Sequence, residues 1–330
     1  MTSIKDVATE ALVSISTVSL AYNDPMRVAE ETRKRIFSAA RKLGYVAKIC
    51  KARDALKRPA IVLTSGEFSA FQQAVMQGIH EGLNDCGIEM IFMSVSEGNA
   101  SAYQMLMDMV KYGQISGMIL FTTFAYTSVF EDLAHVYGIP VVRCMGAEVC
   151  EHSGSVIVDN YDAGVQVARY CIGRRYASIK ILGPSFSGGE MRVKGFLNTI
   201  GQARAKIGIK RIQAEQDEDC ISGYRKMTEI LRSGDPLPDA LFCLTDSIAI
   251  GAIGAMQEHQ IRIPDDVAVI GCDDIPAARY IQPELTTICI PRREQGYQAS
   301  LLLSRMVNGG TLEHIVVKPK LIERASSKGR

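Results

Sequence analysis

The stretch IKDVATEALVSISTVSLAYNDPMRVAEETRKRIFSAARKLGY, residues 4–45, determines how the start of this chain folds. Ser3, with Asp6 three residues later, resembles a capping box and predicts a first helix of about two turns. Ser14 is placed to cap a second helix, and a third is expected over Glu30–Leu43, ended by a glycine. Two short helices joined by a tight turn and supported by a third form the helix-turn-helix arrangement.

Apolar residues recur on one side of each of these helices, which predicts a small common core. The residues expected to be buried are Val7, Ala8, Ala11, Val18, Ala21, Ile36, Phe37, Ala40 and Leu43. The second helix then turns Ile15, Ser16 and Leu20 outward. In a helix-turn-helix this is the helix that enters the major groove of DNA.

The charge of the chain is unevenly distributed. Residues 1–60 hold 12 Lys/Arg and 6 Asp/Glu, a net charge of +6, whereas the remainder holds 25 basic and 30 acidic residues, a net charge of −5. A basic head on an acidic body is typical of a nucleic-acid-binding module. The alternative, a small helical cap packed on the larger domain, does not account for this asymmetry.

The motifs IKDVA, VSISTVS, V-x-E-x-T-R-x-R-I and A-x-x-L-G-Y together resemble the head of the LacI/GalR family of bacterial transcription regulators. The resemblance is dense over residues 4–45 and continues more thinly to the C-terminus. It implies that Ile15, Ser16 and Leu20 read base edges, while most other contacts are to the phosphate backbone. The residues expected at the DNA are Ile4, Lys5, Ser14, Ile15, Ser16, Thr17, Leu20, Asn23, Arg27 and Thr32.

Three positions depart from the family pattern. Leu12 stands where a turn glycine is usual, so a positive φ there would strain it. Leu20 stands where an arginine is common, and leucine contacts a thymine methyl rather than guanine. Ala29 replaces the serine that caps the third helix, a change that typically costs about 1 kcal/mol.

Residues 47–59 are expected to link the head, residues 1–46, to the body. In the resembling family this segment is a hinge helix that inserts a leucine into the minor groove. Asp54 occupies the usual leucine position and Leu56 lies two residues later. Lys51 and Arg53 are placed to neutralise phosphates, so the expected hinge residues are Lys51, Arg53 and Leu56. A solvated basic linker is the alternative.

From residue 60 onward, apolar strands alternate with helices, which predicts parallel sheets with right-handed crossovers. About ten strands in two runs indicate an α/β body of two lobes. The resemblance implies a type I periplasmic-binding-protein-like fold crossed three times by the chain. The effector-binding and dimerisation domain is then 60–330, with a first lobe of about 60–159 and 288–317 and a second of about 160–287 and 318–330.

In such a body, ligands bind at the carboxyl ends of strands, in the cleft between the lobes. Arg192, in GGEMRVKGF, matches the family arginine that clamps the effector, and pairing with Asp273 or Asp246 is its alternative role. Where many sugar-binding relatives place an aromatic residue, this chain has Glu218. The residues expected at the effector are Phe71, Asp159, Arg192, Thr245 and Asp273.

Several functional classes find no support in the sequence. It lacks the G-x-S-x-G, Walker A and HExxH motifs, and the five histidines are isolated, so neither an enzyme, a metal site nor a cofactor is expected. Nine scattered cysteines without a CxxC pair indicate reduced thiols in the cytosol. No secretory signal and no apolar run of about 18 residues is evident, so a cytoplasmic, nucleoid-associated protein without a membrane partner is expected.

The sequence thus predicts a repressor that binds a near-palindromic DNA operator as a homodimer, controlled by a small-molecule effector such as a sugar. The absence of a leucine-heptad tail after Arg324 favours a dimer over a tetramer. Two alternatives remain: a degenerate regulator without effector response, and a cytosolic solute-binding or sensor protein.

Overall fold

The computed structural model describes residues 2–45, 58–64, 70–95, 100–121, 127–144, 152–214 and 219–328. The chain forms two compact units. Unit 1 comprises Met1–Ile157 and Arg292–Ile315, and unit 2 comprises Val158–Pro291 and Val316–Arg330. Within the described ranges, no helix is long and apolar enough to cross a membrane.

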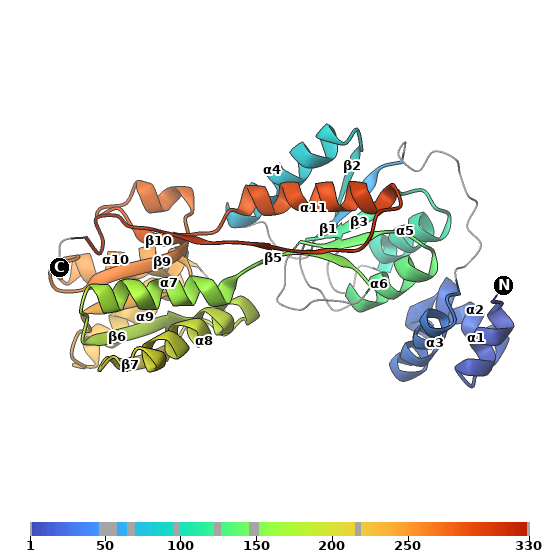
Figure 1. Ribbon diagram of the computed structural model, residues 1–330. Helices are drawn as coiled ribbons and strands as arrows, with labels where there is room; N and C mark the ends of the chain where they lie inside the picture. The colour runs from blue at the N-terminus through green and yellow to red at the C-terminus, as the bar shows by residue number, and fades with distance from the viewer. Residues whose placement is uncertain are drawn as a thin grey trace. The chain divides into compact units, whose positions relative to one another are not determined.

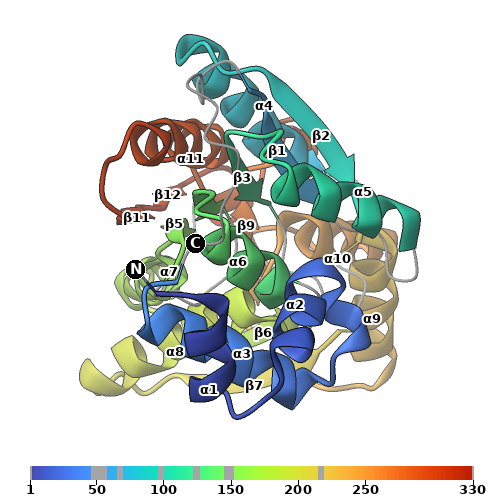
Figure 2. The ribbon, with the colours of Figure 1, turned by 90° about the vertical axis from the view of Figure 1, so that its right-hand side faces the viewer.

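The head begins unit 1 and contains three α-helices, which Figure 2 shows in blue. They are α1 (Ile4–Glu10), α2 (Ile15–Asn23) and α3 (Glu30–Lys42), with a 3-10 turn at Pro25–Arg27 before α3. The predicted core is confirmed, since Val7, Val18 and Phe37 are fully buried, whereas Leu43 is only half-buried. Tyr22 adds to this core, because its ring stacks on Phe37 with the centroids 5.8 Å apart.

The remainder of unit 1 is built on a six-stranded sheet with the order β11-β5-β4-β3-β1-β2 (Figure 1). Its strands are β1 (Ala60–Thr64), β2 (Met90–Ser94), β3 (Gly117–Leu120), β4 (Val141–Arg143), β5 (Gly154–Val158) and β11 (His314–Val317). Its helices are α4 (Ala70–Asp85), α5 (Ala100–Lys111), α6 (Thr127–Val136) and α11 (Arg292–Val307). The pairs β1–β2, β1–β3, β3–β4 and β4–β5 are parallel, as the strand–helix alternation predicts.

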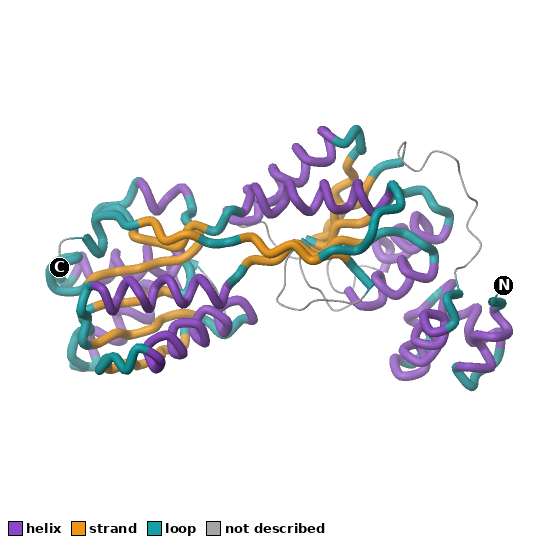
Figure 3. Tube along the Cα trace, viewed as in Figure 1, coloured by secondary structure: helices purple, strands orange, loops and turns teal. Residues whose placement is uncertain are grey.

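Unit 2 repeats this plan with a six-stranded sheet of order β12-β10-β9-β8-β6-β7. Its strands are β6 (Ser178–Gly183), β7 (Gly208–Gln213), β8 (Ala240–Cys243), β9 (Ala268–Asp273), β10 (Thr286–Cys289) and β12 (Lys320–Ile322). Its helices are α7 (Asn160–Gly173), α8 (Ser187–Gln202), α9 (Cys220–Arg232) and α10 (Asp246–Glu258). Figure 3 shows helices covering the strands of this unit, and β12 pairs antiparallel with β10.

Glycines bring the helices α7 and α8 close together, and the two lie side by side in Figure 1. A Cβ on Gly164 of α7 would lie 1.8 Å from the carbonyl oxygen of Arg192, and one on Gly195 would lie 2.1 Å from that of Tyr161. Real Cβ atoms essentially never approach backbone so closely, so both positions require glycine. This close packing of α7 against α8 sets the position of Arg192, which lies on α8.

The predicted alternation of strands and helices is confirmed, with small differences at the ends of elements. Two of the strands, β11 and β12, are short and follow one another closely in the C-terminal part of the chain. The first crossing between units falls after Ile157, two residues before the predicted lobe boundary at residue 159. Residues 47–57 of the predicted linker 47–59 lie outside the described residues.

Candidate DNA-binding head and effector site

The first two helices of the head begin at the predicted caps. The backbone N–H of Ser3 donates to Asp6 Oδ2 at 2.7 Å, and the N–H of Asp6 donates to Ser3 Oγ at 3.4 Å, which completes a capping box. At α2, the N–H of Thr17 donates to Ser14 Oγ at 3.0 Å. These bonds satisfy amides that a helix start otherwise leaves unpaired, and they set where α2 begins.

The outer face of α2 carries the residues predicted to read DNA bases. Ile15 is 45% exposed and Leu20 is 36% exposed, and Ser16 is also exposed. Large apolar side chains on a small surface helix are available to a partner, and the partner that fits a helix-turn-helix is a DNA groove. The side chains that are proposed to read bases are therefore exposed and available to a partner.

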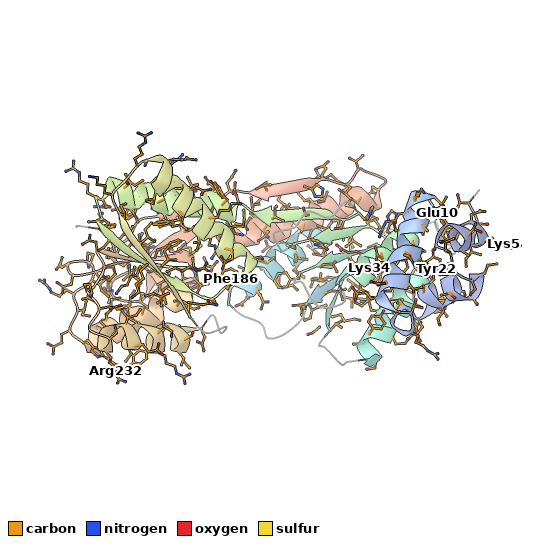
Figure 4. The ribbon with its side chains drawn as sticks, turned by 90° about the horizontal axis from the view of Figure 1, so that it is seen from below. Lys5, Glu10, Tyr22, Lys34, Phe186 and Arg232 are labelled. Atoms are coloured by element: carbon orange, nitrogen blue, oxygen red, sulfur yellow. The ribbon has the colours of Figure 1, made fainter. Side chains whose placement is uncertain are left out.

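Most of the residues predicted at the phosphate backbone also lie at the surface of the head. Lys5, Asn23 and Arg27 are exposed, and Arg27 Nε lies 3.9 Å from Asp24 Oδ2. Asn23 Nδ2 donates to the carbonyl oxygen of Ser19 at 2.8 Å. The predicted DNA residues that are only partly exposed are Ile4, Thr17 and Thr32. Figure 4 shows the side chains of the head as sticks.

Two of the three departures from the family pattern have a structural consequence. Leu12 adopts φ 55°, the left-handed conformation that favours glycine, with its side chain 83% exposed. Ala29 is the N-cap residue of α3 and has no side-chain oxygen to bond the first amides of that helix. The predicted strain and the predicted missing cap are both confirmed.

Arg192 is the buried cation of the predicted effector site, and it is 2% exposed. Its Nε donates to Asn160 Oδ1 at 3.0 Å, its Nη1 donates to the carbonyl oxygen of Leu244, and its Nη2 lies 3.5 Å from Asp273 Oδ1. Asn160 begins α7, whereas Leu244 and Asp273 lie at the carboxyl ends of β8 and β9. The structure therefore brings Arg192 and Asp273 together where ligands of such sheets bind.

Two other predicted effector residues serve as helix caps. Asp159 accepts from the amide of Asp162 at 2.9 Å, and its other oxygen accepts from Lys318 Nζ at 2.5 Å. Thr245 Oγ1 accepts from the amide of Ile248 at 3.3 Å and is nearly fully buried. The sequence motif that contains Asp159 also contains Asn160, and it is Asn160 that contacts Arg192.

A buried carboxylate lies beside this site. Asp246 Oδ1 accepts from Thr287 Oγ1 at 2.5 Å, and its Oδ2 accepts from the amide of Ile275 at 2.9 Å. A Cβ on Gly271 would lie 2.2 Å from Asp246 Oδ1, so that glycine makes room for the carboxylate. Burial, followed by the nearby Asp273 carboxylate, raises the pKa of Asp246 to about 7.

Sequence reasoning did not identify Phe186 as a residue of this site. Its ring lies 5.5 Å from the guanidinium carbon of Arg192. The two glycines that follow it closely, Gly188 and Gly189, were the available signal. The hinge residues Lys51, Arg53 and Leu56 lie outside the described residues. Glu218 and the side chain of Phe71 also lie outside them.

Comparisons with known proteins agree with this arrangement. Residues 3–48 match the family described as bacterial regulatory proteins, lacI family, and residues 168–327 match the periplasmic binding protein-like domain. The HTH-type transcriptional repressor PurR of Escherichia coli O1:K1 is 32% identical over 335 residues, which cover 99% of this chain and 97% of the relative.

Solved structures share the fold. A complex of the transcriptional regulator CelR with cellobiose has a TM-score of 0.70 at 21% identity, covering 99% of this chain and 100% of CelR. The lac repressor dimer bound to operator and the anti-inducer ONPF has a TM-score of 0.69 at 21% identity, covering 99% of each chain. The full-length match to PurR, the basic helix-turn-helix head and the two-sheet α/β body together establish that this chain belongs to the LacI family of bacterial transcription regulators.

Proposed function

We propose that this protein is a transcriptional repressor whose head reads an operator with the outer face of α2. The observation that carries the proposal is the exposure of Ile15, Ser16 and Leu20 on a capped helix that is packed from behind by the head core. The two apolar side chains suit thymine methyl groups, and a serine hydroxyl bonds to either donors or acceptors on base edges. Lys5 and Arg27 supply phosphate contacts that fix the register.

The proposed effector is a small polyhydroxylated metabolite of the sugar class, held in unit 2 by Arg192 and Asp273. A guanidinium and a carboxylate side by side offer donors and acceptors together, which suits hydroxyl groups that act as both. Cellobiose in CelR supports this class. The effector can alter operator affinity only by binding one state of the protein more tightly than the other. No catalytic step is part of this proposal, and the protein acts in the cytoplasm, where its DNA lies.

The proposed active species is a homodimer on a near-palindromic operator, as in the lac repressor dimer bound to operator. Strand β2 ends the sheet of unit 1, and its Phe92 is 42% exposed. Met105 on α5, the next helix along the chain, is 56% exposed. Exposed apolar side chains on this edge strand and on the helix that follows it in the chain support an interaction surface for a second copy of the chain.

The proposal is tested by DNA-binding titrations at several salt concentrations, against upstream fragments of the protein's own gene and against random DNA. The double substitution Ser16→Ala and Leu20→Ala should weaken operator binding by roughly tenfold or more, because each base contact is worth about 1–3 kcal/mol. Binding to random DNA should not change. Lys5→Ala is the matched control: it should weaken both kinds of binding and reduce the salt slope by about 1. Equal loss on both DNAs for the double variant would show that α2 does not read bases.

The same titration separates the proposal from its alternatives. Operator binding that no metabolite alters would favour a regulator without effector response. Absence of operator binding at low salt would leave the body as a ligand sensor of another kind.

A further inference from the structure

The head is joined to the rest of unit 1 by a packed contact as well as by the linker. The buried apolar residues of the head and those around the six-stranded sheet of unit 1 form one continuous cluster. Helix α3 of the head packs against α6, the helix that precedes β4. A head attached only through a linker would instead keep a separate core of its own.

A partly buried ion pair lies at this contact. Arg41 Nη1, in the last turn of α3, donates to Asp132 Oδ1 of α6. The side chains of Arg41 and Asp132 are 25% and 19% exposed, so water screens this pair less than it screens an exposed ion pair. Burial raises the pKa of the Asp132 carboxyl, and the Arg41 guanidinium opposes that rise. Without Arg41, the carboxylate would regain a favourable environment only if the head moved away.

Three tyrosines extend the contact beyond the ion pair. The hydroxyl of Tyr137, the residue that follows α6, donates to the carbonyl oxygen of Tyr22 at 3.5 Å. Tyr22, which Figure 4 labels, stacks on Tyr45 with the ring centroids 6.0 Å apart. Tyr22 and Tyr137 are both buried. Because Tyr22 also stacks on the core residue Phe37, its contact with Tyr137 holds the core of the head and not one loose side chain.

Helix α6 is itself fastened to the sheet of unit 1. Glu131, the neighbour of Asp132, is buried and accepts from both Nε and Nη2 of Arg143 in β4 at 2.5 Å. The Ser153 hydroxyl donates to the same carboxylate at 2.9 Å. A two-pronged arginine–carboxylate pair fixes orientation as well as distance. Asp132 therefore follows a residue that is fixed to β4, and α6 holds the head in a set orientation relative to the sheet of unit 1.

We propose that Asp132 and Tyr137 form a docking site for the head, and that docking sets the orientation in which α2 meets the operator. The reading face of α2 stays exposed in the docked head, so docking and DNA binding are compatible. A docked head has already lost the orientational freedom that operator binding would otherwise remove. This inference rests on the proposed function, because it concerns the head that is proposed to read the operator.

Docking within one chain requires only a weak contact. A short linker gives an effective concentration on the order of 1 mM, so a contact with a Kd of about 0.1 mM is formed roughly nine tenths of the time. One partly buried ion pair and the tyrosine contacts beside it are of the kind that supply such an affinity. The same weakness means that a single charge reversal should release the head.

Charge reversal across the contact tests whether the pair holds the head. Arg41→Asp places two carboxylates against each other and should speed hydrogen exchange in α3 and α6. Adding Asp132→Arg restores a pair of opposite charges and should restore slow exchange. Arg35→Asp is the matched control, because it changes the charge of the head by the same amount. Arg35 is exposed on α3, about 120° around the helix from Arg41.

DNA titrations then test what docking does. Arg41→Asp should bind a near-palindromic operator roughly tenfold more weakly than Arg35→Asp does, because two undocked heads must be ordered at once. On a fragment with a single half-site the two variants should bind alike, since the whole molecule can turn to fit one head. One extra base pair between the half-sites should weaken binding less for Arg41→Asp than for the unmodified protein, because undocked heads adapt to the spacing. The variant with both reversals should recover operator affinity and spacing preference.

Three results would overturn the inference. Unchanged hydrogen exchange in Arg41→Asp would show that the ion pair does not hold the head. Tighter operator binding by Arg41→Asp than by Arg35→Asp would show that docking opposes DNA binding. An equal loss of affinity on the operator and on the single half-site would assign Arg41 to direct DNA contact.

Failure of the proposed function gives a different pattern. If the unmodified protein bound no operator, the proposed function would be refuted, and the role of docking in DNA binding with it. Fast exchange in Arg41→Asp and its reversal by Asp132→Arg would still be observed, because these measurements require no DNA.

Discussion

Leu12 occupies a backbone conformation that a glycine would adopt without strain. Its φ of 55° costs a non-glycine residue about 1–3 kcal/mol, and its exposed side chain recovers little of this by packing. The turn between α1 and α2 keeps this geometry because the caps on both helices and the core behind them determine its path. Strain at a single residue is thus tolerated by the rest of the head.

Leu12→Gly should stabilise the head by about 1 kcal/mol. The free energy gained by relieving the backbone strain exceeds the cost of the extra conformational entropy that glycine loses on folding. Hydrogen exchange of the amides in α1 and α2 measures this as slower exchange. Leu12→Ala serves as control, because alanine removes the exposed bulk but keeps a Cβ in the left-handed region. Equal stabilisation by both variants would mean that the exposed side chain of Leu12, and not its backbone strain, destabilises the head.

A buried carboxylate joins the ends of neighbouring strands in unit 2. Asp246, at the start of α10, bonds to β10 through Thr287 and to the segment after β9 through the amide of Ile275. A neighbouring carboxylate, Asp274, accepts from Arg324 and Arg279. These bonds hold the segments that carry Asp273, so the geometry of the proposed effector site depends on residues that need not touch a ligand.

The contribution of Asp246 to the free energy of unfolding should fall as the pH rises from about 4 to 7. The pKa of Asp246 is about 7 in the folded protein and near 3.9 when unfolded, so in this window the folded state retains a proton that the unfolded state has lost. Urea unfolding at a series of pH values measures the trend. Asp246→Asn should flatten it, whereas Asp265→Asn, at an exposed position, should not. An unchanged slope in Asp246→Asn would assign the pH dependence to other groups.

The proposed effector residues Arg192 and Asp273 lie in unit 2, and the proposed reading helix α2 lies in unit 1. The sugar response of a regulator built this way requires that ligand bound in one unit changes the DNA affinity of the other. Such coupling needs two states that bind the ligand with different affinity.

Arg192→Ala should abolish the effect of sugar on operator binding and leave binding without sugar intact, because Arg192 lies in unit 2 whereas α2 lies in unit 1. Gel shifts with and without sugar measure both quantities. Arg211→Ala provides the control, since Arg211 pairs with Glu190 at the surface of the same unit. An unimpaired sugar response in Arg192→Ala would remove this residue from the effector site.

Met105→Glu should weaken the proposed homodimer by placing a charge in its apolar surface. Sedimentation should then show more monomer at a given concentration, and operator affinity should fall in parallel because two heads no longer bind together. Leu197→Glu, at an exposed position on α8 in unit 2, should leave the dimer intact. A dimer unaffected by Met105→Glu would place the interface elsewhere.

Features that depend on neighbours along the chain could be predicted from the sequence. Caps at Ser3 and Ser14, the apolar periodicity of the head and the alternation of strands and helices are local signals, and the structure contains each of them. The positive φ at Leu12 fits the family resemblance, which places a glycine at this position.

The side chains that meet at the proposed effector site are brought together by long-range packing. Asp159 and Asn160 are adjacent in the sequence, yet one caps α7 and the other contacts Arg192, because successive residues at a helix start point in different directions. Phe186 lies beside Arg192 because two glycines leave space for its ring. Such contacts arise from the close crossing of α7 and α8 and from strand ends brought together in a sheet, distances that no local pattern encodes.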